Sequence, residues 1–431
     1  MKPTLRPWNG DTCSRSHSGS LLGDSIAPTC RTLNQATTLK TTFTAPIWAS
    51  AFRPFYLLGT LYAPLLVAAW LGAYLGYWGP ALDVPLLRLL HGHEFIFGFS
   101  AAIISGIVLT ALPSWAGTEE IRGARLALLA MLWLAGRIVF WTSPWLPVEL
   151  TATIDCLFFP VMFLMLAPQL LRASNPLYLL LLPILLAMAT ANLVYHHGIA
   201  TANPDQAWFA LRLAIYAVIV LYVLKGGVLA PVFTGNALRE KGRGELPPLN
   251  MTLEIVAVCS VLLLAVLDLA SAPPAWTGYA ALACTVFHGW RTLRWQGWRV
   301  ADVPLVGIMH LGFAWLVLAF ALKAASQLTG GIPETAWLHA FTVGSLGLMM
   351  LGLMTRVSLR HTGRPLMVPR AMLLAYSLMF VAALLRLAAG IHVLGTAAIA
   401  ASALLWAASF ALYLAAFTKI LVTPSSPRNT P

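Results

Sequence analysis

The chain has 431 residues, of which 59% are hydrophobic and 10% are charged. Its mean hydropathy of +0.78 lies far outside the balance of a soluble globular protein, so the composition indicates an integral membrane protein and excludes the soluble classes. A net charge of +12 is compatible with nucleic-acid binding, but the basic residues fall in short loops between apolar runs. The charge therefore reflects membrane topology, and nucleic acid is not expected as a partner.

The first 45 residues differ from the rest of the chain, being rich in Ser, Thr and Pro. No apolar run follows Lys2 and Arg6, as a secretory signal would require. We expect 1–45 to be a disordered cytoplasmic tail, 46–421 to form the membrane domain and 422–431 to be a cytoplasmic C-terminal tail. The five cysteines are too few and too scattered for a disulfide framework.

Apolar runs of about 20 residues, each long enough to cross a bilayer, recur along the chain between breaks rich in Pro, Gly or charge. They predict an all-α, polytopic integral membrane protein with about twelve transmembrane helices. The runs cover 54–78, 91–113, 124–142, 147–171, 176–197, 206–233, 251–270, 274–291, 303–326, 336–359, 371–392 and 394–420.

Lys and Arg fall in every second loop between these runs, in clusters around Arg122, Arg172, Lys241, Arg294 and Arg364. By the positive-inside rule these loops and both chain ends face the cytoplasm. Histidines and one glutamate then lie at the outer side, namely His91, His93, Glu94, His196, His197, His339 and His392.

Three arginines lie inside apolar runs, one or two turns from the outer ends: Arg137, Arg212 and Arg386. Charge within a membrane is costly and usually serves a function. Three arginines at one depth, beside histidines, favour an anionic ligand at that level. The alternative is that each side chain snorkels to the lipid headgroups.

The stretch "HGHEFIFGF", residues 91–99, opens an apolar run with two imidazoles and a carboxylate. On a helix His91 and His93 are separated by about 200°, so they cannot face the same metal unless the first turn is unwound. Glu94 lies three residues after His91, on the same helix face, and can orient the imidazole of His91 or carry a proton. The alternative is that such a histidine only packs and hydrogen-bonds inside the membrane domain.

A shift of 246 residues aligns this stretch with a later one, so that "HEFIFGF" matches "HAFTVGS". His93 then falls on His339 and Gly98 on Gly344. We expect a parallel internal repeat, because eight predicted spans separate the two copies. Chance similarity between Gly-rich apolar helices is the alternative.

Small residues near the histidines suit a bulky, flat cofactor that approaches the helix backbone. Gly98 and Gly344 are the candidates next to His93 and His339, and His310 also lies among glycines. Imidazoles with few thiolates suit haem iron or copper, and the carboxylates of a porphyrin would explain buried arginines. Close helix packing through small residues is the alternative, whereas structural zinc fits poorly because no cysteine is near.

Long sequence motifs resemble the NnrS family of bacterial membrane proteins over residues 50–420. They are "FRPFYLLGTLYA" (52–63), "HGHEFIFGF" (91–99), "LTALPSWAG" (109–117), "LWLAGR" (132–137) and "LHAFTVGSLGLMMLGLMTRVSLRHTGRP" (338–365). The chain departs from the family pattern at Val228, where relatives tend to have Arg, and at Arg360, where they tend to have Gly. The first departure weakens any role for a charge at that position.

The resemblance implies a twelve-span haem protein of the bacterial inner membrane, with copper as a second associated metal. It also implies a link to denitrification, nitric oxide and nitrosative stress. The absence of a "CxxCH" motif means that haem, if bound, is held non-covalently as in b-type haem proteins. An enzyme of this kind would reduce nitric oxide and need an electron donor. Glu94 is the candidate catalytic group, and Asp155 and Glu149 are further proton carriers.

A secondary transporter for a small anion is the rival function, since repeats and Gly/Pro-interrupted spans are typical of carriers. Among metal ligands, His93 and His339 rank first because they are equivalent in the repeat and lie at equal depth. His91 is the alternate on its span. His196 or His197 reaches the same level, although at most one of them can face the same centre. His310 lies in the inner half of its span, where it serves a second cofactor or packing.

Overall fold

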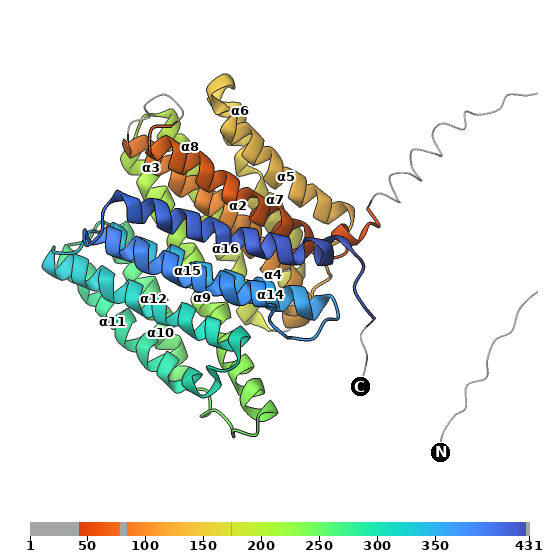
Figure 1. Ribbon diagram of the computed structural model, residues 1–431. Helices are drawn as coiled ribbons and strands as arrows, with labels where there is room; N and C mark the ends of the chain where they lie inside the picture. The colour runs from red at the N-terminus through yellow and green to blue at the C-terminus, as the bar shows by residue number, and fades with distance from the viewer. Residues whose placement is uncertain (1–42, 78–83, 174, 428–431) are drawn as a thin grey trace, which may run out of the picture. The chain divides into compact units, whose positions relative to one another are not determined.

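A computed structural model describes residues 43–77, 84–173 and 175–427, and these form an all-α domain without a strand (Figure 1). The predicted fold class is confirmed. Most of the expected N-terminal tail, and residues 428–431 of the C-terminal one, lie outside the described residues.

The helices follow the predicted apolar runs closely. In chain order they are α2 (Phe52–Tyr74), α3 (Val84–His93), η2 (Glu94–Ser100), α4 (Ala101–Ala116), α5 (Ala124–Trp141), α6 (Val148–Cys156), α7 (Phe158–Leu170), α8 (Leu181–Ala200), α9 (Pro204–Glu240), α10 (Met251–Leu269), α11 (Pro274–Arg294), α12 (Pro304–Thr329), α13 (Thr335–His339), η6 (Ala340–Leu346), α14 (Gly347–His361), α15 (Arg370–Gly390) and α16 (Thr396–Val422).

Within the described residues, eleven helical segments are long and apolar enough to cross a membrane. Four of them join neighbouring elements, such as Leu86–Ala116, which contains most of α3 and all of η2 and α4. The twelfth predicted run, 274–291, forms α11. It contains polar residues, among them His288 and Arg291, and is not one of the eleven apolar segments. Its 21 residues nevertheless extend about 30 Å, and it packs beside α10 and α12 (Figure 1).

Two π-helical segments support the predicted internal repeat. The shift that aligns His93 with His339 also aligns η2 with η6 at both ends, and it aligns the first residue of α5 with that of α15. A π-helix is rare and usually marks a functional site. A π-helix directly after each of the two aligned histidines therefore supports the repeat more strongly than the shared glycines do.

The chain closes on itself through packing of α16 against α2. Arg53, only 2% exposed, reaches from α2 to the end of α16, where its guanidinium donates to the carbonyl oxygens of Leu421 (2.7 Å) and Thr423 (2.7 Å). It also donates to Ser425 Oγ (2.9 Å). These bonds satisfy carbonyl groups that a helix end leaves without partners.

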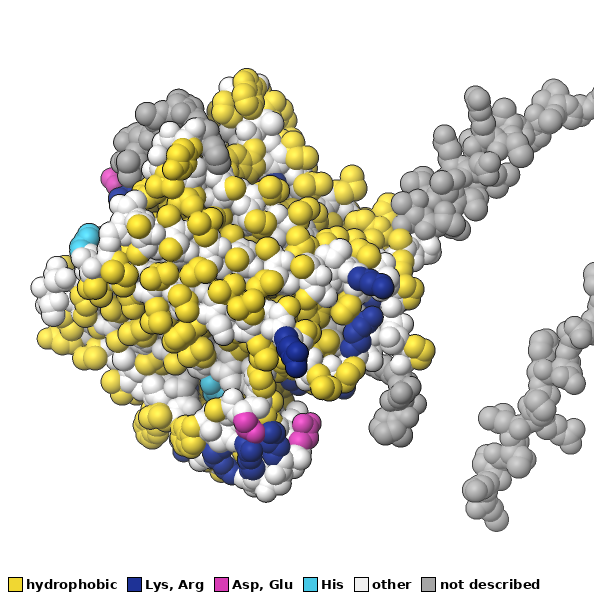
Figure 2. Space-filling view, in the orientation of Figure 1, with side chains coloured by type: hydrophobic (Ala, Val, Ile, Leu, Met, Phe, Trp, Pro, Cys, Tyr) yellow, Lys and Arg dark blue, Asp and Glu magenta, His cyan; other side chains and the backbone are white. Residues whose placement is uncertain are grey.

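Basic side chains gather over one end of the helices, while the sides of the helices are hydrophobic (Figure 2). The loops after α9 and α11 meet there, with Asp302 bound to Lys241 and Arg243. Hydrogen bonds from Arg243 and Lys241 hold the pKa of the Asp302 carboxyl well below its usual range. The histidine-rich ends of α3 and α8 lie at the opposite end of the bundle.

Reporter fusions test two things together: on which side of the membrane the loops lie, and whether α11 crosses the membrane. Four crossings, including α11, separate Pro204 from Gly330, so fusions after both residues should report the outer side. If α11 did not cross, the two fusions would report opposite sides. A cytoplasmic signal at both positions would instead reverse the predicted orientation.

Replacement of Arg53 tests the tie between α2 and the end of α16. Arg53→Met should lower the free energy of unfolding by about 2–4 kcal/mol, because buried carbonyl groups lose a charged donor. The midpoint of thermal unfolding in detergent measures the effect. Arg125→Ala is the control, since its contact with Glu119 is exposed and long (3.5 Å). Equal midpoints for the two variants would show that the tie contributes nothing.

Candidate functional site

The two histidines of "HGHEFIFGF" face opposite sides of their helix. His91 lines a large cavity, whereas His93 is fully buried in a polar network on the other side. This arrangement agrees with their helical separation, which prevents the two histidines from binding the same metal. One helical turn therefore contributes to two separate sites.

The cavity has a volume of about 560 Å³, within the usual range for a site that binds a small organic molecule. Its wall comes mainly from α3, η2, α9, α13, η6, α15 and α16, and most of it is apolar and aromatic. Its basic and imidazole side chains are Arg88, His91, Arg212, His339, Arg386 and His392.

The imidazole of His339 is oriented as metal ligands usually are. Its Nδ1 lies 2.8 Å from the carbonyl oxygen of Thr335. Since a carbonyl can only accept, Nδ1 carries the proton and Nε2 keeps its lone pair. His91 differs, because its buried Nδ1 has no hydrogen-bond partner and its ring lies between Trp70 and Phe95, at centroid distances of 4.6 and 4.3 Å.

Two of the predicted arginines, Arg212 and Arg386, contribute to the cavity wall. The buried Nε of Arg212 has no hydrogen-bond partner, and neither arginine forms an ion pair with a carboxylate of the described residues. Cations in an apolar cavity suit an anionic ligand. An oriented imidazole, an orphaned guanidinium nitrogen and a cavity of this size together fit a haem with its two carboxylates.

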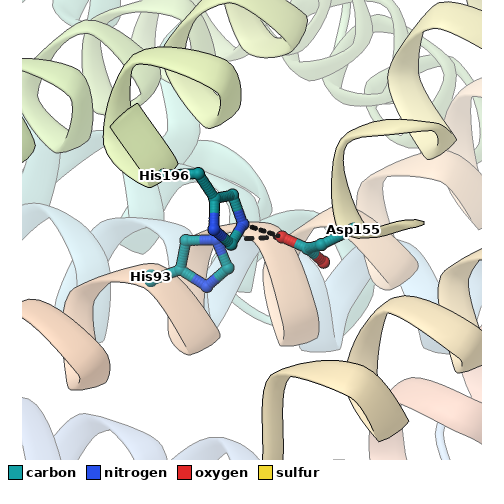
Figure 3. Close-up of side chains that lie close together, drawn as sticks. All are labelled: His93, Asp155 and His196. Carbon is teal, nitrogen blue, oxygen red and sulfur yellow. Dashed lines mark hydrogen bonds and ion pairs between the residues drawn. The ribbon is translucent and has the colours of Figure 1, made fainter. Parts of the chain in front are cut away.

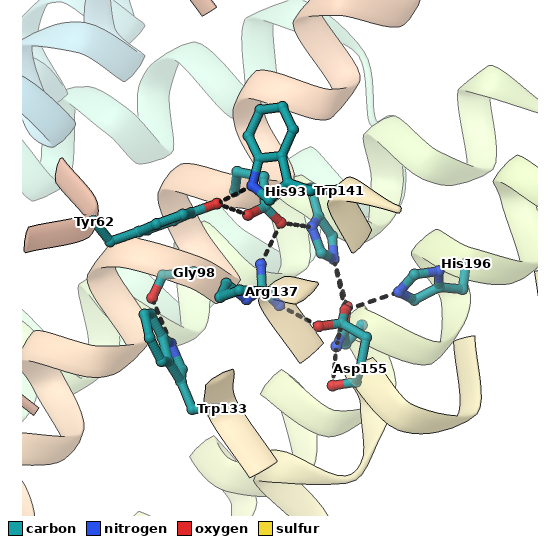
Figure 4. A network of polar contacts seen from close by, with 10 residues as sticks. Tyr62, His93, Gly98, Trp133, Arg137, Trp141, Asp155 and His196 are labelled. Carbon is teal, nitrogen blue, oxygen red and sulfur yellow. Dashed lines mark hydrogen bonds and ion pairs between the residues drawn. The ribbon is translucent and has the colours of Figure 1, made fainter. Parts of the chain in front are cut away.

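A buried polar network lies on the side of the helix away from the cavity, and five parts of the bundle contribute side chains to it (Figure 4). Its members are Tyr62 of α2, His93 and Glu94 at the α3–η2 junction, Arg137 of α5, Asp155 of α6, and Asn192 and His196 of α8. All but Tyr62 are at most 5% exposed.

Hydrogen bonds and ring stacking fix the imidazole of His93 in place. Its Nδ1 lies 3.0 Å from Glu94 Oε1, and its Nε2 lies 2.8 Å from Asn192 Oδ1. The ring stacks on Phe140 and Tyr195, at centroid distances of 4.5 and 4.3 Å. A histidine with both ring nitrogens engaged and both faces covered has little freedom to move.

Arg137 bridges the two acids of the network, donating to Glu94 and to Asp155. Two glycines make room for this contact. A Cβ at Gly136 would come within 2.7 Å of Asp155 Oδ1, and one at Gly98 within 3.2 Å of Arg137 Nη1. Gly98 therefore accommodates the arginine rather than the cavity.

The other predicted residues lie apart from both sites. His197 is exposed and hydrogen-bonds Gln206 (2.7 Å), and His310 contacts Thr234 (2.7 Å). A Cβ at Gly344 would meet the ring of Trp315. The structure also places Arg137 in the network and away from Arg212 and Arg386, so the three arginines do not converge on one ligand.

Asn192 and Tyr62 are network members that the sequence reasoning missed. Asn192 precedes His196 by four residues and so shares its helix face, which was a usable signal. Asp155 was foreseen only as a proton carrier, whereas it contacts Arg137, Asn192 and His196. Tyr62, bonded to Glu94, gave no signal, because helical periodicity does not identify neighbours on other helices.

A family model described as NnrS protein matches residues 46–425. The chain belongs to the NnrS family. This family is associated with nitric oxide, and its members are membrane proteins. No curated protein matches the chain. The motif "LWLAGR" of this NnrS protein supplies Gly136 and Arg137 to the network, and "HGHEFIFGF" supplies His91 to the cavity and His93 to the network.

Removal of the bridging cation should destabilise the protein strongly. Arg137→Met leaves two buried carboxylates without their shared cation, so the free energy of unfolding should fall by about 3–5 kcal/mol. Arg137→Lys should recover only part of the lost stability, because an ammonium group cannot form the forked pair of hydrogen bonds that bridges both acids. Thermal unfolding in detergent measures both effects. Trp141→Phe, which removes an exposed bond to Tyr62, is the mild control; a midpoint for Arg137→Met equal to that control would contradict the bridge.

Proposed function

We propose that this NnrS protein binds haem non-covalently in the cavity and uses it to bind nitric oxide near the outer face of the bacterial inner membrane. The observation that supports this most is the oriented imidazole of His339 in the same cavity as two arginines without carboxylate partners. The link to nitric oxide comes from the family. Haem, when bound, supplies an iron centre for small diatomic ligands or single electrons.

We propose that His339 would bind the haem iron. A ligating histidine almost always donates its other ring nitrogen to an oxygen acceptor, which fixes its tautomer. His339 has this partner in Thr335, whereas Nδ1 of His91 has none. His91, which lines the same cavity, would instead hydrogen-bond the small ligand.

The arginines hold the carboxylates of the haem in this proposal. Arg212 and Arg386 come from α9 and α15, so they can bind separate groups of one flat molecule. Charged hydrogen bonds of this kind are about twice as strong as neutral ones. The aromatic wall, which includes Trp70, Trp208 and Trp406, excludes water and packs on an apolar ring system.

Spectra of the purified full-length protein test the assignment. The wild-type protein should show a Soret band, and His339→Ala should lower haem content at least tenfold, because the iron loses its protein ligand. Added imidazole should restore part of the band. His91→Ala should keep haem but change the spectrum of the nitric oxide complex.

His197→Ala is the matched control, since His197 is exposed and lies outside both sites. Arg212→Gln and Arg386→Gln should each weaken haem binding about 10–100-fold, the usual effect of losing a supporting group. Wild-type haem content in His339→Ala would refute the assignment of His339 as the iron ligand. A colourless wild-type protein that binds a small anion, and loses this binding in Arg212→Gln, would instead support the transporter function.

A further inference from the structure

We propose that His93, Asp155 and His196 form a binding site for a divalent first-row transition metal ion, separate from the cavity. One possible ligand atom from each of His93, Asp155 and His196 lies within 4.8 Å of the others. The carboxylate oxygen Oδ2 of Asp155 is 3.2 Å from His93 Nε2 and 2.8 Å from His196 Nε2 (Figure 3). Three helices, α3, α6 and α8, thus bring one donor atom each to a common point.

The hydrogen-bond pattern around His93 is the one that a metal ligand requires. Glu94 can accept a hydrogen bond from Nδ1–H (3.0 Å), and in that tautomer Nε2 offers its lone pair to a metal. Carboxylate, imidazole and metal in this order are a common arrangement in metalloproteins. Glu94 is itself fixed by Arg137 and Tyr62.

Without a metal, the same contacts demand extra protons. Both Nε2 atoms point at one oxygen of Asp155, so each must carry a proton to bond it. His93 would then be protonated on both nitrogens, a buried imidazolium beside the guanidinium of Arg137. A metal ion would take the place of both N–H hydrogens: His93 would lose one proton, and the neutral His196 would carry its hydrogen on Nδ1, so binding should release about one proton per ion.

The donor set limits the kind of ion. Two imidazoles and one carboxylate suit Fe²⁺, Zn²⁺ or Cu²⁺, and the 2-His-1-carboxylate set is well known for non-haem iron. No thiolate belongs to this group of the described residues, which disfavours Cu⁺. The amide oxygen of Asn192, 2.8 Å from His93 Nε2, is placed as a fourth donor.

The surroundings are rigid enough to hold such a site. The exposed fractions of His93, Asp155 and His196 are 0%, 3% and 5%. The guanidinium of Arg137 binds the other oxygen of Asp155 and leaves Oδ2 to the imidazoles. Preformed and buried donors of this kind favour tight binding, because little must be ordered when the ion arrives.

Metal content is the decisive measurement. The full-length protein, purified in detergent and stripped with a chelator, is incubated separately with Fe²⁺, Cu²⁺ or Zn²⁺, and bound metal is counted by mass spectrometry. The wild-type protein should retain about one ion per chain of at least one metal, with release of protons. Asp155→Asn and His196→Ala should each weaken binding at least tenfold, the usual minimum for loss of a ligand or its support.

His197→Ala is the adjacent control and should bind like the wild type. His339→Ala should also keep the ion, so loss of haem and loss of this metal are separable results. For Cu²⁺, electron paramagnetic resonance should show nitrogen couplings that weaken in His196→Ala but not in His197→Ala. Absence of any retained ion in the wild-type protein, or equal retention in His196→Ala and His197→Ala, would overturn the site.

Discussion

Charge inside a bilayer must be compensated by the protein itself, because hydrocarbon offers neither water nor counterions. Arg137 meets this constraint by binding two acids at once, Glu94 and Asp155. The bridge joins α5 to the η2 segment and to α6. The position of His93 depends on it, since both acids that bridge to Arg137 also contact this imidazole.

The same constraint recurs elsewhere in the membrane domain. Lys323 is fully buried and binds Asp268 (2.6 Å) and Glu334, while Arg291 binds Glu254. The cavity differs from these places, because Arg212 and Arg386 have no such acid among the described residues. Paired charges thus stabilise the bundle, whereas Arg212 and Arg386 line the space in which we propose a ligand.

The sequence was sufficient for most of the fold. Apolar run length predicted the spans, and a single shift of the chain predicted a repeat that the two π-helices support. The helical angle between His91 and His93 predicted that the two do not face the same metal, and the structure places them on different sides of their helix. The composition of α11 was the exception, because its polar residues sit among apolar ones and only its packing beside α10 and α12 shows its place.

The site was harder to predict, because depth in the membrane says nothing about direction around a helix axis. Arg137 shares its level with Arg212 and Arg386, yet it points into the network and they point into the cavity. His93 and His339 are equivalent in the repeat, yet they serve different sites. The repeat position of Glu94 is occupied by Ala340, so the second copy lacks the acid on which the network depends.

The π-helix η2 also fixes how the rest of its span faces its neighbours. A π-turn holds an additional residue, so everything beyond Ser100 is rotated relative to a continuous α-helix. If this segment were α-helical with all of its residues kept, the following half-span would be turned by about 100°. The face formed by Gly106 and Thr110, which now packs on α2, would then point elsewhere. The π-helical conformation of this short segment is therefore as constrained as its chemistry.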